Sequence, residues 1–477
     1  MLASLVAVAA LLSAPGAAAQ SDPACVGDTD AVNVEQKPGA PLLRFGIGPL
    51  VQAGQIGPTP ADAIPEEPQR TDDALRRLRP EGGPFVLRLN RFFWSDGEAA
   101  FTRYLGLAER FTSQGYLVEL QVRYHPSPEQ EGDIAAWTEH VREVVRRFGA
   151  SPGVVALQIA NEVNLTFSPD SSDGAYDGAR QALVSGVIAA KDEARKLGHD
   201  QLEIGFNWAY RVDPANETSF WQGLRDRGGK EFVTSLDWIG LDAYPGTVFP
   251  PAESEGGERD GMVNGMSALR CYAQVPGIPE SVPMKVEDNG WPTQPPARSY
   301  EKQASVLELM VRAVHDFRGT YNVSDYRWFN LRDGDTGSPL LFQHFGLLES
   351  DYERKPAFEV YRRLVSELAR RDREAQPRIR LRLRLRGGRG PGGCRRGRVR
   401  AVVAGDDAGA ARRAAFFRGR RRVRRDRRPP LSAVVHRPHP EPRHAHRARA
   451  RVRLEDGRLL RLTRRFRACS RRPPAPG

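Results

Sequence analysis

The sequence predicts an α/β protein, built as a (β/α)8 (TIM) barrel with a small β-sandwich after it. Three observations support this prediction. Between residues 42 and 369, short apolar runs rich in β-forming residues alternate with segments of helical periodicity. Two of those runs end in motifs that contain glutamate, and a barrel carries its functional side chains at the carboxyl ends of its strands. After residue 378 the sequence becomes arginine-rich and shows the period-two alternation of strands.

Eight apolar runs are expected to be the barrel strands. They span residues 42–47, 85–89, 117–122, 154–159, 202–206, 238–241, 284–286 and 326–329. The run 154–159 is β-rich and uninterrupted, as expected for a parallel strand buried on both faces. A doubly wound open sheet is the alternative fold, but no Gly-x-Gly-x-x-Gly turn follows the first run.

Helical periodicity separates the predicted strands. The expected helices span residues 72–78, 98–114, 133–148, 175–197, 300–317 and 356–368. Ser299 is a suitable N-cap for the helix at 300–317, and Gly115 and Gly198 are suitable residues for ending the helices before them. The segment 246–261 is rich in Gly, Pro and acids, and we expect it to be a loop.

The N-terminus resembles a secretory signal peptide. Residues 2–19 are apolar and small and end in three alanines, so cleavage is expected near Gln20. A disordered apolar N-terminus is the alternative. Residues 20–41 would then form an arm before the barrel at 42–369. No other apolar run reaches the length of a membrane span, and we therefore expect a soluble, secreted protein.

The charge divides the chain into two units. Residues 378–477 contain 33 Arg, no Lys and six acids, whereas the rest contains 38 basic and 53 acidic residues. We expect a linker at 370–381, an immunoglobulin-like β-sandwich at 382–470 and a short tail at 471–477. The Asp456-Gly457 pair predicts a hairpin turn within this sandwich. A shifted reading frame is the alternative origin of so much arginine.

Cysteine positions support a folded C-terminal unit. Cys394 and Cys469 bracket the predicted sandwich, and we expect them to form a disulfide. Arginine clusters such as 420–425 could contact an anionic cell-wall polymer. Nucleic acid is an unlikely partner because the tail has only three aromatic residues for base stacking. A solvated arginine surface with no partner is the favoured interpretation.

Two motifs indicate chemistry. Asn161 and Glu162 follow the fourth predicted strand, and Glu287 begins the motif Glu-Asp-Asn-Gly-Trp-Pro after the seventh. Both strands should deliver a glutamate to the same rim of the barrel. Retaining glycoside hydrolysis requires two facing carboxyl groups. One of them acts as the acid/base and the other as the nucleophile.

These motifs, in this order and at these strands, resemble glycoside hydrolase clan A, which includes the family five cellulases and mannanases. The resemblance covers residues 42–368. It implies that Glu162 is the acid/base and Glu287 the nucleophile. The acid/base should have a raised pKa, and the nucleophile should stay ionised.

The resemblance also implies substrate-binding residues. Arg88 would be the cation beside the nucleophile, with Arg91 as its competitor. Tyr244 resembles the clan tyrosine that hydrogen-bonds the nucleophile, and Asn161 the asparagine that contacts the sugar 2-hydroxyl. The chain has Asp242 where many family five members have histidine two residues before this tyrosine.

Further aromatic residues are candidates for the cleft. Trp328 on the eighth strand could stack against a sugar ring, or could belong to the core. His125 after the third strand could line the cleft or be structural. Trp291 is a weaker candidate, and it and Trp208 are expected to pack.

The sequence therefore predicts a secreted retaining glycosidase that acts on an oligo- or polysaccharide and needs neither metal nor cofactor. The rival hypothesis is a catalytically silent glycan-binding protein on a barrel scaffold.

Overall fold

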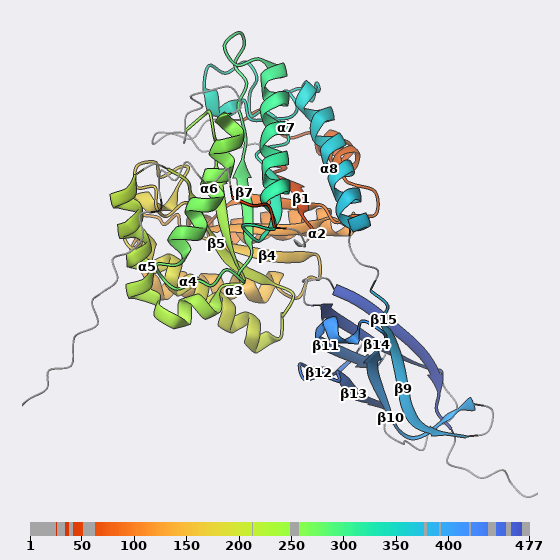
Figure 1. Ribbon diagram of the computed structural model, residues 1–477. Coiled ribbons are helices and arrows are strands. Elements are labelled where there is room, and N and C mark those ends of the chain that lie inside the picture. Colours follow the sequence, from red (N-terminus) through yellow and green to blue (C-terminus); the bar gives the residue numbers. More distant parts are fainter. Residues whose placement is uncertain are drawn as a thin grey trace, which may run out of the picture.

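Eight parallel strands close into a barrel, in which each strand pairs with the next and β8 pairs with β1 (Figure 1). The structure is a computed structural model that describes residues 25, 34–37, 42–50, 63–211, 213–248, 257–375, 379–390, 393–418, 421–436, 445–454 and 459–469. The barrel strands are β1 (Arg44–Ile47), β2 (Val86–Phe93), β3 (Leu117–Arg123), β4 (Val154–Ile159), β5 (Glu203–Ala209), β6 (Trp238–Ala243), β7 (Met284–Asn289) and β8 (Val323–Trp328). The predicted barrel is confirmed.

Helices follow the strands and cover the outside of the barrel (Figure 1). They are α1 (Pro68–Leu78), α2 (Gly97–Ser113), α3 (Ile134–Phe148), α4 (Ala179–Leu197), α5 (Pro214–Ser235), α6 (Gly257–Ala273), α7 (Tyr300–Phe317) and α8 (Pro356–Ala375). Short 3-10 turns are η2 (Trp94–Asp96), η3 (Asp173–Ala175), η4 (Leu341–Gln343) and η6 (Ala408–Ala410). The Ser299 side chain accepts a hydrogen bond from the Lys302 amide, as predicted for the N-cap of α7.

Three helices differ from the sequence prediction. Helix α5 was not predicted, because three glycines interrupt its pattern and Gly229 has a non-helical backbone inside it. Helix α6 begins within the segment expected to be a loop. Helix α8 continues through residues expected to form the linker. Its Asp372 is buried, where it accepts hydrogen bonds from Arg318 (2.7 Å) and from the amide of Leu43 (3.1 Å).

Ion pairs fill the barrel interior below its carboxyl-terminal rim, where four of the six paired residues are buried and Arg44 and Glu203 are partly exposed. The paired residues, which we call the interior layer, are Arg44, Glu119, Glu203, Lys285, Asp325 and Arg327. Lys285 lies 3.0 Å from Glu119, Arg327 lies 2.7 Å from Asp325, and Arg44 lies 2.8 Å from Glu203. Each acid here has a base in contact, which is the condition for burying a carboxylate in its charged form.

The C-terminal unit is a two-sheet antiparallel sandwich. One sheet has the order β13-β10-β9 and the other β12-β11-β14-β15. The strands are β9 (Arg382–Arg389), β10 (Arg395–Ala404), β11 (Ala411–Arg418), β12 (Arg421–Asp426), β13 (Ser432–His436), β14 (Ala445–Leu454) and β15 (Leu459–Arg467). Apolar residues from both sheets form a separate core, including Val399, Phe416, Ala450 and Val452. The sandwich fold is thus confirmed, while the expected Asp456-Gly457 turn lies outside the described residues.

Two disulfides join distant parts of the chain. Cys394 and Cys469, the expected pair, are bonded and tie β10 to the end of β15. Cys25 is bonded to Cys271 of α6 and anchors the N-terminal arm to the barrel. The predicted signal peptide at residues 1–19 lies outside the described residues. Within the part of the chain that is described, no helix has the length and apolar character to cross a membrane.

Candidate active site

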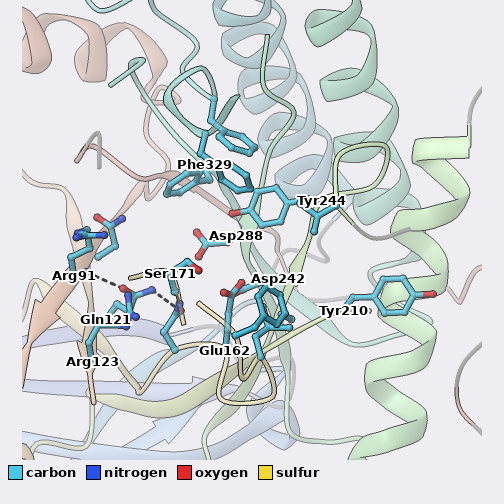
Figure 2. Close-up of a pocket in the computed structure, with 18 residues that line it drawn as sticks. Arg91, Gln121, Arg123, Glu162, Ser171, Tyr210, Asp242, Tyr244, Asp288 and Phe329 are labelled. Carbon is cyan, nitrogen blue, oxygen red and sulfur yellow. Dashed lines mark hydrogen bonds between the residues drawn. The ribbon is translucent and has the colours of Figure 1, made fainter. Parts of the chain in front are cut away.

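A pocket opens at the carboxyl-terminal rim of the barrel and encloses about 110 Å³ (Figure 2). One wall is polar and consists of Asn90, Arg91, Gln121, Arg123, Asn161, Glu162, Asp242 and Asp288. The other wall is mainly aromatic and includes Tyr244, Phe329, Phe342 and Phe345. Because a sugar ring has polar edges and apolar faces, this division suits a carbohydrate.

Glu162 reaches the pocket from the end of β4 through an unusual backbone. Its φ is 46° and that of Ala160 is 59°, both in the left-handed region that costs a non-glycine residue ~1–3 kcal/mol. Hydrogen bonds hold this turn in place. The Glu162 amide donates to Asn207 Oδ1 (2.9 Å), and the Asn161 amide donates to Asp173 Oδ2 (2.9 Å). The strained turn aims the carboxyl of Glu162 into the pocket.

Burial, followed by the charge of the nearby Asp288 carboxylate, raises the pKa of the Glu162 carboxyl to about 8 against the opposing effects of Arg123 and Arg88. A carboxyl with this pKa keeps its proton at neutral pH. Glu162 therefore has the property that general acid catalysis requires.

Two more carboxyl groups face Glu162. The side chains of Asp242 from β6 and Asp288 from β7 point toward it, and the Tyr244 hydroxyl points toward Asp288 (Figure 2). We call Glu162, Asp242 and Asp288 the rim carboxylates. Burial, followed by the charges of Asp288 and Glu162, raises the pKa of Asp242 well above its usual range. Burial and the same carboxylates raise the pKa of the Tyr244 hydroxyl.

Asp288 is the rim carboxylate with a cationic partner. Arg88 Nη1 donates to Asp288 Oδ1 at 2.8 Å, and Arg88 Nη2 donates to Gln158 Oε1 at 2.8 Å. Burial raises the pKa of Asp288 to about 6, with Arg88 opposing the rise. Asp288 therefore ionises at a lower pH than Glu162, which is the order that an acid and a nucleophile need.

Glu287, the nucleophile expected from the sequence, does not line this pocket. Its side chain is fully buried beneath the rim, 3.5 Å from Arg88 Nε. Burial and the adjacent Glu119 raise the pKa of Glu287 well above its usual range. The residue that follows it in the sequence, Asp288, takes the position in the wall.

Asn161 lies where the sequence predicted, with its side chain in the pocket wall. Its Oδ1 accepts hydrogen bonds from Gln121 Nε2 (2.7 Å) and Asn207 Nδ2 (2.8 Å), and its Nδ2 donates to the Ser171 carbonyl (2.8 Å). The side chain is thus held rigidly. Arg91, the competitor of Arg88, also lines the pocket but pairs with Asp170 at 2.8 Å.

The remaining aromatic candidates lie away from the pocket. Trp328 is fully buried and donates to the Phe345 carbonyl, while the next residue, Phe329, enters the pocket wall. Trp291 is buried under Arg298, whose guanidinium lies 3.7 Å from the ring centroid. His125 stacks on Phe93, with 4.2 Å between the two ring centroids. Burial, followed by the charge of Arg123, lowers the pKa of this histidine to about 4.

The sequence analysis missed several residues of the pocket wall. Asp242 and Asp288 belong to the motifs at the carboxyl ends of β6 and β7, but the sequence does not indicate that they face inward. Apart from Tyr244, the aromatic residues named for the second wall come from residues 329–345, which follow β8 and contain three phenylalanines. Three phenylalanines in one loop after a barrel strand are the sequence feature that could have indicated an apolar wall of the pocket. Among the described residues, no group of three or more His, Cys, Asp or Glu is arranged to hold a metal ion.

No protein-family model and no curated protein matches the sequence. Several solved structures of glycosidases resemble the fold. A GH5_18 protein from Streptomyces cattleya, in complex with GlcNAc, is 15% identical over 72% of this chain and 83% of its own, with a TM-score of 0.47. A fungal β-1,4-galactanase is 12% identical over 68% of this chain and 99% of its own, with a TM-score of 0.46.

A β-glucuronidase from Bacteroides uniformis is 13% identical over 91% of this chain, with a TM-score of 0.43. The chain spans only 46% of the length of that enzyme. These matched structures are named as a β-glucuronidase, β-1,4-galactanases and a GH5_18 protein. At such identities they concern the barrel fold, and the argument for an activity rests on the pocket.

Proposed function

We propose that this protein is a secreted retaining β-glycosidase that cleaves an oligo- or polysaccharide by double displacement. The observation that carries the proposal is the pairing of rim carboxylates in one pocket. Glu162 has a pKa raised to about 8, and it faces a carboxylate that ionises at lower pH beside Arg88. Retaining hydrolysis needs one carboxyl that holds a proton and one that has lost it.

In the first step, Glu162 gives its proton to the glycosidic oxygen as the bond to the anomeric carbon breaks. A carboxylate at the end of β7, where the sequence pointed to Glu287, forms an ester with that carbon. In the second step, Glu162 takes a proton from water, the water oxygen attacks the anomeric carbon, and the ester breaks. Both carboxyl groups then regain their starting state.

The substrate would lie between the two walls of the pocket. Its apolar ring face would pack against the aromatic wall that contains Phe329 and Phe345. Its hydroxyls would meet Asn161 and Tyr244, in the roles that the resemblance to clan A implies. Export is supported by two disulfides, which persist in oxidising compartments.

The test is turnover of a panel of aryl β-glycosides together with soluble β-glucans, mannans and galactans. We expect hydrolysis of at least one β-linked substrate, and loss of that activity in Glu162→Ala on substrates with poor leaving groups. If the folded protein binds a member of the panel and turns over none, the silent glycan-binding hypothesis replaces the enzyme.

A second function, attachment to an anionic polymer, is favoured by the outer face of the sandwich. On β14 and β15, exposed Arg447 lies opposite Arg465, and exposed Arg451 lies opposite Arg461. Like charges in facing positions destabilise a sheet, so a row of them suggests an anionic partner that offsets the repulsion. Binding to an anionic wall polymer should weaken steeply with salt, and binding that does not respond to salt would contradict this proposal.

A further inference from the structure

The seventh strand contains an extra residue, and this decides which carboxylate enters the pocket. On the side of β6, Leu241 pairs with Val286 but the next residue, Asp242, pairs with Asp288. On the side of β8, Tyr326 pairs with Val286 and Trp328 pairs with Asn289, so β7 again has one residue more than its partner. This is a β-bulge, which re-aims the side chains that follow it.

The contacts on each side of the bulge show the result. Glu287 keeps the inward direction that alternation gives it and lies among the charges of the barrel interior, near Arg88 and Glu119. Asp288 would point outward in a regular strand, but it faces inward, one level nearer the rim, where it meets Arg88 Nη1 at 2.8 Å. Asn289 then points outward, with Met310 Sδ 3.3 Å from its Nδ2.

We infer that Asp288, rather than Glu287, is the nucleophile of the proposed reaction. The inference rests on the proposed function, because it assigns one of that function's two roles. A nucleophile must contact the anomeric carbon, and Asp288 is in the pocket wall whereas Glu287 lies sealed beneath it. An aspartate can form the glycosyl ester as a glutamate can, since either residue serves in retaining enzymes.

Electrostatics agree with the geometry. Glu287 is held next to Glu119, and two carboxyl groups in contact share one proton. Burial acts against ionisation of Glu119, yet Lys285 and the contact with Glu287 lower its pKa to about 2, so the shared proton belongs to Glu287. A protonated, buried carboxyl does not attack carbon. Glu287 is therefore assigned as a positioning residue, with its Oε2 3.5 Å from Arg88 Nε, and Arg88 Nη1 in turn donates to Asp288 Oδ1.

Chemically, one oxygen of the Asp288 carboxylate bonds to the anomeric carbon while the bond from that carbon to the leaving oxygen breaks. Glu162 supplies the proton that the leaving oxygen takes. Water then attacks the same carbon, its proton goes to Glu162, and the ester bond to Asp288 breaks with both electrons returning to the carboxylate. Atoms and charge balance without any co-reactant.

The experiment is covalent trapping with 2,4-dinitrophenyl 2-deoxy-2-fluoro-β-glycosides of glucose, mannose and galactose. The fluorine slows both steps and the reactive leaving group preserves the first, so the ester accumulates. Trypsin releases residues 286–298, in which Glu287 and Asp288 are the second and third residues. Tandem mass spectrometry distinguishes a label on either one. We expect the label on Asp288.

A label on Glu287 would overturn the inference and leave the proposed function standing. The absence of both label and turnover in the folded wild-type protein would contradict the inference and the proposed function together. The matched variants Asp288→Asn and Glu287→Gln give an independent measurement. The first should lower kcat by about 10⁴-fold or more. Glu287→Gln should lower kcat by less than about a hundredfold, as expected for a residue that only positions a reactive group.

Rescue by azide separates the two roles further. In Asp288→Ala, azide can occupy the space of the lost carboxylate, attack the anomeric carbon from the same side and restore turnover with release of the inverted product, the α-glycosyl azide. In Glu287→Ala, the space lies below the pocket, and azide should restore nothing. Rescue of the second variant and not the first would contradict the assignment.

Discussion

The interior layer and the rim carboxylates hold the same kinds of side chain at neighbouring levels of one barrel, yet they behave in opposite ways. In the interior layer, burial of Glu119 is outweighed by Lys285, by the contact with Glu287 and by Arg327, and the pKa of Glu119 falls to about 2. At the rim, three carboxyl groups share mainly Arg88, and the pKa of Glu162 rises to about 8. The balance of acids and bases thus decides whether a buried carboxylate stabilises the fold or holds a proton for chemistry.

Replacing the proposed acid at the rim should affect activity more than any change in the interior layer or the sandwich. Glu162→Ala should lower kcat/KM by about 10²–10⁴-fold on glycosides with poor leaving groups, because those need a proton as the bond breaks. Activity on dinitrophenyl glycosides should fall far less. Glu129 is exposed, so Glu129→Ala serves as the control and should have wild-type activity on both kinds of substrate. Equal losses on both kinds of substrate would mean that Glu162 has another role.

Breaking the interior layer should affect stability rather than chemistry. Lys285→Met leaves Glu119 without its closest cation, and we expect a loss of ~3–5 kcal/mol in the free energy of unfolding at pH 7, measured with urea. The double variant Lys285→Met/Glu119→Gln should recover part of this loss.

The pH dependence of that stability has a definite sign. Because the pKa of Glu119 is lowered on folding, its contribution is present above the unfolded value of about 4.3 and is lost as pH falls toward about 2. Wild-type protein should therefore lose more stability between these values than Lys285→Met. Equal pH slopes for the two proteins would contradict the account of the interior layer.

Activity should depend on pH through the rim carboxylates. The proposed nucleophile must be ionised, so kcat/KM should fall as pH drops below about 6, where Asp288 takes up its proton. The acid must be protonated, so kcat/KM should also fall as pH rises above about 8. A bell-shaped profile measured on a poor leaving group would agree with both, and a profile flat from pH 5 to pH 9 would contradict both.

Removing the sandwich should have the smallest effect on catalysis. Arg422 of β12 lies 3.6 Å from Asp200, which precedes β5 and therefore lies at the end of the barrel opposite the pocket. A chain that ends after residue 376 keeps all of α8. It should hydrolyse a small soluble substrate as the full chain does, and it should lose binding to an anionic polymer. An inactive but folded barrel would mean that the sandwich contributes to the site.

The fold was predictable because buried parallel strands leave apolar runs that the sequence displays directly. Helices α5 and α6 were harder, since glycines and acids obscure their apolar faces. The sequence predicts a linker at the end of α8 because charged residues are typical of a solvated segment. In the structure Asp372 is buried and accepts a hydrogen bond from the amide of Leu43, which is distant in sequence. Such a partner cannot be seen in a local pattern.

At the site, Glu162 and Asn161 could be found from one motif because they follow a regular strand. The motif of β7 is harder to interpret, because a bulge places Asp288 in the pocket wall whereas alternation alone brings Glu287 to the inside of the barrel. Trp328 shows a related limit. The sequence leaves open whether Trp328 stacks on a sugar or belongs to the core; in the structure it ends β8 inside the core, and Phe329 lines the pocket.

The most direct test of the account is the stereochemistry of the first product. Proton NMR of the anomeric signal, recorded before mutarotation, reports the configuration released from a β-linked substrate. Double displacement through Glu162 and a β7 carboxylate predicts that the β-anomer appears first and the α-anomer later. If the α-anomer appears first, no covalent intermediate forms, and the retaining mechanism built on the rim carboxylates is contradicted.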